Sequence, residues 1–235
     1  MPPHSEQIVS RICGALFRGS LASLLFIDSC GAVDLSQAMD ACPGAAKFIQ
    51  AQISRQLAAA PPKAPVVTDE AKRHRLLEHE EEDQRLYEQL ASGGVNPTTL
   101  KELQARNLRY LHKELGHAVS IPSIDEVGRD GLAALWLLIQ HANGDIELQS
   151  KALKKFEPMV KSGEIDASKF ALLSDRVLLA SGKPQRFGSQ LLSLTTGEPL
   201  DLGNPVAIER ERDALGLMKL ADYRCISEQL YKNSH

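Results

Sequence analysis

Polar side chains interrupt the apolar face of four successive helical segments in this sequence. They are Asp83, Asn107, His141 and the neighbouring pair Asp175 and Arg176. A buried polar group without a partner costs about 1–3 kcal/mol, and a buried charge costs more. Because the same departure recurs in four segments, the pattern predicts a shared buried polar network built by several helices.

His141 is the residue of this set that could transfer a proton near neutral pH. In an enzyme, Asp175 would orient the imidazole, and Arg176 together with Arg212 would bind an anionic substrate. In the structural alternative, His141 binds a buried carboxylate or the carbonyl groups at its helix end. Asp175 would then simply pair with Arg176 or Arg212.

Amide side chains and one glycine could complete such a site. Gln149, Gln185 and Gln190 each offer hydrogen-bond donors and acceptors, and Gly188 would let the backbone approach a ligand or a helix closely. The alternative is that these residues satisfy helix ends and strand edges.

The sequence carries none of the common cofactor or metal motifs. It contains no Gly-rich phosphate loop, no Gly-x-Ser-x-Gly elbow and no His-Glu-x-x-His, and its four cysteines lack Cys-x-x-Cys spacing. We therefore expect no cofactor and no metal site. Classical nucleotide, serine-hydrolase and zinc-protease chemistries are unsupported.

Helical periodicity accounts for most of the chain after residue 68. Asn96-Pro97 and Asn204-Pro205 each provide an N-cap followed by a proline at the first helical position. The run 132–139 is apolar on every side and predicts the central helix of the core. Helices are predicted over residues 68–92, 97–115, 130–142, 145–161, 167–181, 206–215 and about 220–230.

A short β-hairpin is predicted near the C-terminus. Gly182-Lys-Pro184 ends the helical pattern, and the segments 185–193 and 199–203 flank a Thr-Thr-Gly-Glu turn. The predicted fold class is therefore mainly α, a compact helical domain with one small β-hairpin.

The N-terminal segments differ in character from this domain. Residues 1–38 resemble an export signal, with two arginines before a short apolar run and small residues at Ser36-Gln-Ala38; the alternative is a frayed helix in a cytoplasmic protein. Residues 39–67 predict a short helix and an Ala/Pro-rich linker, and residues 68–235 the folded domain. We expect a secreted or periplasmic protein.

The cysteines leave two questions open. A lipid anchor at Cys30 is disfavoured, because Asp28 stands where a small or apolar residue is required. Cys42 and Cys225 would remain after removal of a signal, and they could form one disulfide or stay as two thiols. No apolar run approaches the ~20 residues of a transmembrane segment.

Several motifs together resemble a bacterial family known as domain of unknown function 6624, over roughly residues 76–223. They are Asp83-Gln84, Asn107, 136–142, Gln149, 173–177, 182–190 and 212–217. The chain has Phe187-Gly-Ser-Gln190 where the family has Tyr-Gly-Thr-Gln, and Gly116-His-Ala118 where it usually has Gly-Trp-Pro. The resemblance implies a module without an established activity, and its members often carry export signals.

Three kinds of function fit these observations. The first is a binding module for a small polar ligand or a partner protein, and the second is a hydrolase or transferase with His141 as general base on an anionic substrate. An immunity or inhibitor-like protein is the third. With a net charge of −3 there is no basic field for nucleic acid. An enzyme would need His141 to be reachable in a pocket.

Overall fold

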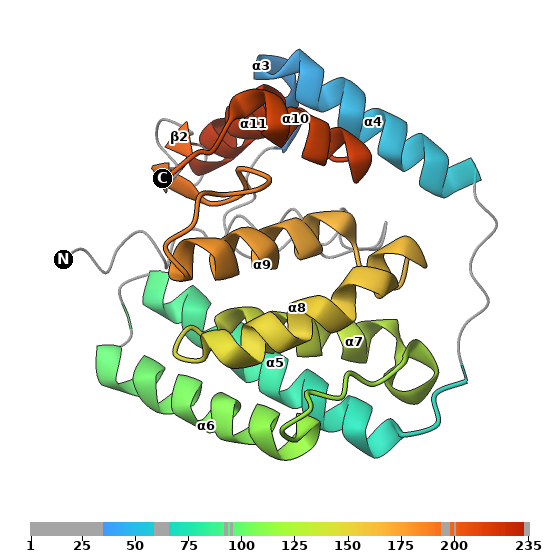
Figure 1. Ribbon diagram of the computed structural model, residues 1–235, viewed down its shortest axis with the longest axis vertical. Helices are drawn as coiled ribbons and strands as arrows, with labels where there is room; N and C mark the ends of the chain where they lie inside the picture. The colour runs from blue at the N-terminus through green and yellow to red at the C-terminus, as the bar shows by residue number, and fades with distance from the viewer. Residues whose placement is uncertain are drawn as a thin grey trace. The chain divides into compact units, whose positions relative to one another are not determined.

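The computed structural model describes residues 35–58, 66–91, 94, 96–193, 198–199 and 201–232. They belong to two compact units, one between residues 63 and 173 and one that joins residues up to 62 with those from 174 onward. The boundary falls within helix α9 (Ala167–Ala180). Figure 1 traces the chain, and the mainly helical class is confirmed.

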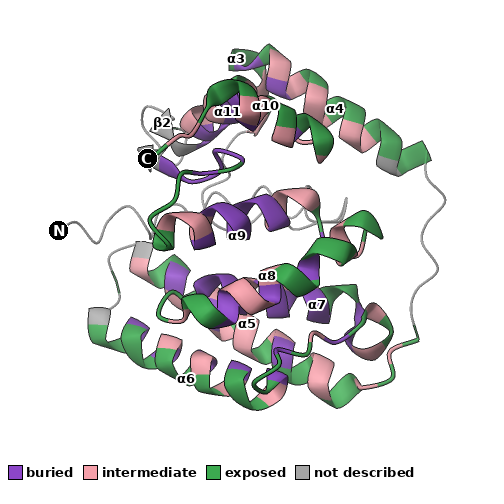
Figure 2. Ribbon diagram, in the orientation of Figure 1, coloured by how far each residue is buried: buried purple, intermediate pink, exposed green. Residues whose placement is uncertain are grey.

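Helix α7 is the centre of the unit between residues 63 and 173. Its apolar run is buried, as the sequence predicts, and α5 packs along it more extensively than any other helix does. Figure 2 shows long buried stretches in α7 and α9. The helices of this unit before α9 are α5 (Glu70–Ala91), α6 (Pro97–Leu115), α7 (Ile124–His141) and α8 (Ile146–Lys161).

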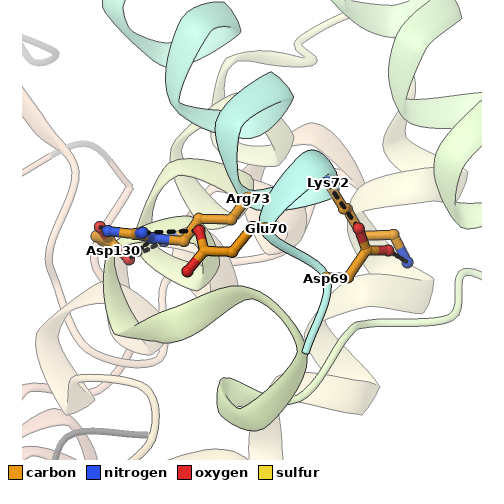
Figure 3. Close-up of polar contacts among 6 residues, drawn as sticks. Asp69, Glu70, Lys72, Arg73 and Asp130 are labelled. Atoms are coloured by element: carbon orange, nitrogen blue, oxygen red, sulfur yellow. Dashed lines mark hydrogen bonds and ion pairs between the residues drawn. The ribbon is translucent and has the colours of Figure 1, made fainter. Parts of the chain in front are cut away.

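Helix α7 begins six residues earlier than the sequence predicts. Ser123 caps it in a reciprocal capping box with Glu126, and a kink follows at Gly128, whose φ is 75°. Helical periodicity is lost at this kink, so the sequence pattern does not reveal the helical turn that precedes it. Two N–H groups of Arg73 on α5 bind the Asp130 carboxylate beyond the kink, as Figure 3 shows. These hydrogen bonds lower the pKa of the Asp130 carboxyl.

The second unit combines segments from both ends of the described chain. Its elements are α3 (Leu35–Ala41), α4 (Pro43–Ala58), the last half of α9, β1 (Leu191–Ser193), β2 (Glu198–Pro199), α10 (Pro205–Ala214) and α11 (Leu220–Lys232). Asn204 caps α10 by accepting from the backbone N–H groups of Val206 and Ala207. One apolar cluster joins α3 and α4 to α11, and a second joins β1, α10 and α11.

Cys42 and Cys225 form a disulfide, which settles the alternative left open by the sequence. Their Cα atoms are 5.9 Å apart and the bond spans 183 residues. It links the residue between α3 and α4 to α11, inside the first apolar cluster.

The predicted hairpin over 185–193 and 199–203 is not supported. Among the residues of this stretch that the structure describes, only β1 and β2, of three and two residues, pair antiparallel, and their register is irregular. The physical reason lies in α9. The backbone N–H groups of Arg186, Phe187 and Ser189 donate to the Asp175 carboxylate, so they are not available for a strand ladder.

The N-terminal segment predicted to be a signal lies outside the described residues as far as residue 34. Its predicted end at Ala38 falls inside α3, where Ala38 is fully buried against α11. Most of the predicted linker, residues 59–65, also lies outside the described part. In the described helices, no stretch is both long and apolar enough to cross a membrane.

Candidate functional site

A chain of hydrogen bonds joins three helices in the unit between residues 63 and 173. Asp83 on α5 is completely buried. Its Oδ1 accepts from Nδ2 of Asn107 on α6 at 3.1 Å, and its Oδ2 binds Nδ1 of His141 on α7. On its other side, Asn107 Oδ1 lies 2.9 Å from Nδ1 of His79. We call these four residues the polar relay.

The amide of Asn107 fixes where the hydrogens of the relay lie. Its Nδ2–H group must face the Asp83 carboxylate, because the reverse orientation would set two oxygens against each other. Its Oδ1 can then only accept, so His79 donates from Nδ1. The Asp83 carboxylate also only accepts, so His141 donates from Nδ1. In the neutral form, each imidazole therefore has Nε2 as its acceptor nitrogen.

Aromatic rings hold both imidazoles in place. The ring of Tyr87 lies 4.5 Å from that of His141, and the Tyr87 hydroxyl accepts from Gln104 Nε2 at 3.0 Å. His79 stacks on Tyr110 with the ring centroids 3.9 Å apart. Burial raises the pKa of Tyr110 to about 12, and the nearby Glu114 carboxylate adds to the shift. The relay is thus packed as well as hydrogen-bonded.

Gln149 closes the C-terminal end of α7, next to His141. Its Nε2 donates to the carbonyl oxygens of Ile139 and Gln140 at 3.0 and 3.1 Å. These carbonyls lie in the last turn of α7, where the Ile139 oxygen also accepts from the backbone N–H of Ala142 at 3.2 Å. Gln149 therefore has the helix-end role that the sequence offered as one of two alternatives.

An open hollow lies along α5 and shares His79 with the relay. Six side chains of α5 line this hollow, which we call the α5 hollow: Arg75, Glu78, His79, Glu81, Glu82 and Arg85. Two of them are tied to α6, since Arg75 pairs with Glu114 at 3.6 Å and Glu82 pairs with Arg106 at 2.5 Å. His79 belongs to both the hollow and the relay, whereas His141 is not part of the lining and is 6% exposed.

Asp175 organises a second polar cluster, in the other unit. Its Oδ1 accepts from the backbone N–H groups of Arg186 and Phe187 at 2.7 and 3.0 Å. Its Oδ2 accepts from the backbone N–H and the hydroxyl of Ser189 at 2.8 and 2.7 Å. We call residues 185–190 the Asp175 loop. Burial raises the pKa of the Asp175 carboxyl, while the hydrogen bonds from Ser189, Phe187 and Arg186 oppose this shift.

Arg212 and Tyr223 hold the same loop from the opposite side. Arg212 is 3% exposed, and it donates to the carbonyl oxygens of Phe187 and Met218 at 2.7 and 2.6 Å. The Tyr223 hydroxyl donates to the carbonyl oxygen of Ser189 at 2.9 Å. Arg212 thus positions main chain, and burial lowers the pKa of its guanidinium.

The two ends of the Asp175 loop are joined by one side chain. Gln185 Nε2 donates to the Gln190 carbonyl at 2.9 Å, and Gln185 Oε1 accepts from the Gln190 N–H at 2.8 Å. Between them, Gly188 has a φ of 66° and lies against Leu220 and Leu202. A side chain at this position would meet both leucines, so the glycine permits the close approach.

The predicted site residues therefore fall into two groups. Asp83, Asn107, His141 and Gln149 meet in one unit, and the members near Asp175 meet in the other. The acceptor for His141 Nδ1 is Asp83, the role proposed for Asp175 in the sequence. Arg176 is half-buried and follows Asp175 directly. A single network joining both groups stays a prediction.

Sequence reasoning missed His79, Ser189 and Tyr223. A signal for His79 exists, because it precedes Asp83 by four residues and so lies on the same face of α5. The signal was hidden by the surrounding run of charges, which predicts a solvated face. Tyr223 binds a main-chain carbonyl, and Ser189 binds Asp175 through both its backbone N–H and its hydroxyl; no spacing in the sequence reveals either contact. Within the described residues, no three His, Cys, Asp or Glu side chains are grouped to hold a metal ion.

The comparison with known proteins identifies a family for this chain but no activity. A family model described as a family of unknown function (DUF6624) matches residues 70–234. The match includes the polar relay, the α5 hollow and the Asp175 loop, and it leaves out α3 and α4. No curated protein and no solved structure matches the chain.

Proposed function

We propose that this chain, which belongs to the DUF6624 family of unknown function, is a binding module that holds a small polar ligand in the α5 hollow. One observation carries the proposal: His79 lines the hollow and is also the outer end of the buried relay. A ligand that contacts the His79 ring would therefore contact a side chain whose orientation is fixed from inside the protein.

The lining predicts the chemistry of the ligand. The α5 hollow combines three carboxylates and two guanidinium groups with an imidazole whose Nε2 accepts hydrogen bonds. Because both signs of charge are present, a ligand with one positive and one negative group fits better than a simple anion or cation. Its donor group would bind His79 Nε2, and its negative group would face Arg75 or Arg85.

The relay prepares the hollow for binding. Holding a histidine in one rotamer normally costs side-chain entropy at the moment of binding. In this protein the bond to Asn107 and the stacking on Tyr110 already fix the His79 ring. The cost is therefore met during folding, which favours binding of a small ligand with few contacts.

A titration followed by NMR tests the proposal. Glycine, acetate and methylammonium serve as probes for a dipolar, an anionic and a cationic ligand, and the signals observed are the His79 ring and the Asn107 side-chain amide. We expect glycine to shift both signals most strongly in the wild type and His79→Gln to abolish the response of the Asn107 amide, the signal that both proteins share. His112→Gln is the matched control, because His112 is an exposed histidine paired with Asp145 on another surface. Equal responses of His79→Gln and wild type would refute the proposal.

The second candidate is a hydrolase or transferase with His141 as general base. The pairing of His141 Nδ1 with a buried carboxylate favours it, because such a carboxylate fixes the tautomer and stabilises the imidazolium that forms when Nε2 takes a proton. The burial of His141 disfavours it. Hydrolysis of p-nitrophenyl acetate and p-nitrophenyl phosphate provides the test. Activity that is lost in both His141→Gln and Asp83→Asn, while the fold persists, would favour the enzyme.

We propose in addition that the protein is secreted or periplasmic rather than cytoplasmic. The Cys42–Cys225 disulfide supports this, since such bonds persist in oxidising compartments. Because α3 begins at Leu35 and Ala38 packs against α11, the removed segment would end before Leu35 rather than at Ala38. Fractionation of a bacterial host that expresses the full chain, with mass measurement of the product, tests both points. An uncleaved product in the cytoplasm, with Cys42 and Cys225 both reduced, would contradict export and cleavage.

A further inference from the structure

The N-terminal helix pair, α3 with α4, is an addition to the family domain. It precedes the matched region 70–234, yet it packs on α11, which lies inside that region. Figure 1 shows both helices of the pair beside α11. The surface they cover on α11 contains Ile226 and Leu230, which are buried in the same cluster; we call it the α11 face.

Small side chains form the fully buried part of this contact. The helix pair contributes Ala38, Cys42 and Ala45 to it, while Leu35, Met39 and Ile49 of the pair pack against the same cluster but stay partly exposed. Gly44 lies so close to Asp222 on α11 that a side chain at this position would overlap the carboxylate. The helices therefore approach closely, but the fully buried side chains of the pair are alanine and cysteine, and its larger apolar side chains are buried only in part. The apolar contact alone thus removes only part of the pair's apolar surface from water.

The disulfide adds a covalent restraint to this apolar contact. It joins residues 183 positions apart, and the entropic benefit of a cross-link grows with the length of the loop it closes. In sequence, most of the stretch between the helix pair and α5 is rich in alanine and proline, a composition typical of a linker. The covalent bond is thus a restraint on the docked position that does not depend on the apolar contact.

We propose that the Cys42–Cys225 disulfide is a redox latch: it holds the N-terminal helix pair over the α11 face, and its reduction by a dithiol releases the pair and exposes that face. The two sulfurs differ in access, since Cys42 is 1% exposed whereas Cys225 is half-buried. A dithiol thiolate attacks Sγ of Cys225, forms a mixed disulfide and expels the Cys42 thiolate. The second thiol of the reductant then displaces the Cys225 thiolate, so two electrons pass to the protein and the dithiol becomes a disulfide.

Hydrogen exchange measured by mass spectrometry tests the latch. The protein is the full chain with Cys13→Ser and Cys30→Ser, which keeps only the latch bond, and the reductant is dithiothreitol. We expect the amides of α4 to exchange at least tenfold faster after reduction, while those of α7 keep their protection. Replacing Cys42 by serine as well should give the fast exchange without any reductant. The oxidised Cys13→Ser, Cys30→Ser protein is the control for both.

Two results would overturn the proposal. Unchanged exchange of α4 in the reduced protein and in the Cys42→Ser variant would show that the apolar contact alone holds the pair. Loss of protection in α7 as well would show that the bond stabilises the entire fold and is not a latch.

Discussion

The Asp83 carboxylate accepts a hydrogen bond from Nδ1 of His141, a residue 58 positions further along the chain, and so joins α5 to α7. Replacing Asp83 by alanine leaves the imidazole and the Asn107 amide without their buried acceptor. We expect the free energy of unfolding to fall by about 1–3 kcal/mol for each of the two buried groups that lose their acceptor. Urea denaturation of the variant measures this loss.

Glu82→Ala is the matched control for that variant. Glu82 is the neighbouring acidic residue on α5, but its pair with Arg106 lies at the surface, where such pairs contribute about 0–1 kcal/mol. A double-mutant cycle between Asp83→Ala and His141→Ala should give a coupling energy above 1 kcal/mol. Additive effects of the two substitutions would contradict the relay.

The pH dependence of stability reports on Asp175. Burial raises the pKa of this carboxyl above its ordinary value of 3.8, so the folded protein keeps the proton at pH values where the unfolded chain has lost it. Linkage then requires the free energy of unfolding to fall as the pH rises from about 4 to the folded-state pKa. Asp175→Asn lacks this contribution, so the stability difference between wild type and variant should become less favourable to wild type over that range. Urea melts of both proteins at several pH values measure it.

An opposite slope would have a clear meaning. If wild type gains stability over the variant as the pH rises, the hydrogen bonds that Asp175 accepts from Ser189 and its neighbours outweigh burial. The carboxyl pKa would then be lowered in the folded protein.

The raised pKa of Tyr110 predicts that the folded protein loses stability at alkaline pH. Its pKa in the folded protein is about 12 against 10.0 ordinarily, so between these values the unfolded chain is deprotonated while the folded protein is not. Stability that is complete below pH 10 should therefore decline as the pH rises towards 12. Tyr110→Phe should decline less steeply in the same melts. The phenolate absorbance of Tyr110 at pH 11, taken as the difference between wild type and Tyr110→Phe, should be smaller in the folded proteins than after unfolding. Equal slopes for both proteins would contradict the shift.

Alanine substitutions at Gly188 and Gly182 distinguish the cost of steric overlap from the cost of backbone strain. Both have positive φ, 66° and 69°, but a Cβ at Gly188 would lie 2.9 Å from a Leu220 methyl group, whereas none is near a Cβ at Gly182. We expect Gly182→Ala to cost about 1 kcal/mol and Gly188→Ala about 1–3 kcal/mol more. Thermal melts of the two variants give the comparison, and equal losses would show that the leucines move aside.

Local sequence patterns predicted the helices well, but they predicted poorly which segments contact one another in the tertiary structure. Asn96, Asp145 and Asn204 cap helices where the sequence indicates, because capping depends on the cap and the first turn alone. The hairpin prediction is not supported for residues 186–190, since the backbone N–H groups of Arg186, Phe187 and Ser189 bind Asp175, which lies outside that segment. The pairing of the cysteines likewise depends on which helices meet, and no spacing in the sequence determines it.

In the candidate site, too, local patterns were more predictive than tertiary contacts could be. The presence of Asp83, Asn107 and His141 on apolar stripes correctly predicted buried polar groups that bond to one another. The partner of each group was less accessible to prediction, because it depends on how neighbouring helices are turned. His79 illustrates this, since only its contact with Asn107 distinguishes it from the charged residues around it.

Asp83 also constrains how this part of the chain could change in length. One carboxylate meets side chains from α6 and α7 at once, so the rotation of three helices about their axes is set at a single point. An inserted residue within one of them turns everything beyond it by about 100° and would swing its polar group away from that point. Insertions and deletions should therefore be accepted in the connections between these helices and rejected inside them, a test that a library of single-residue insertions could read out directly.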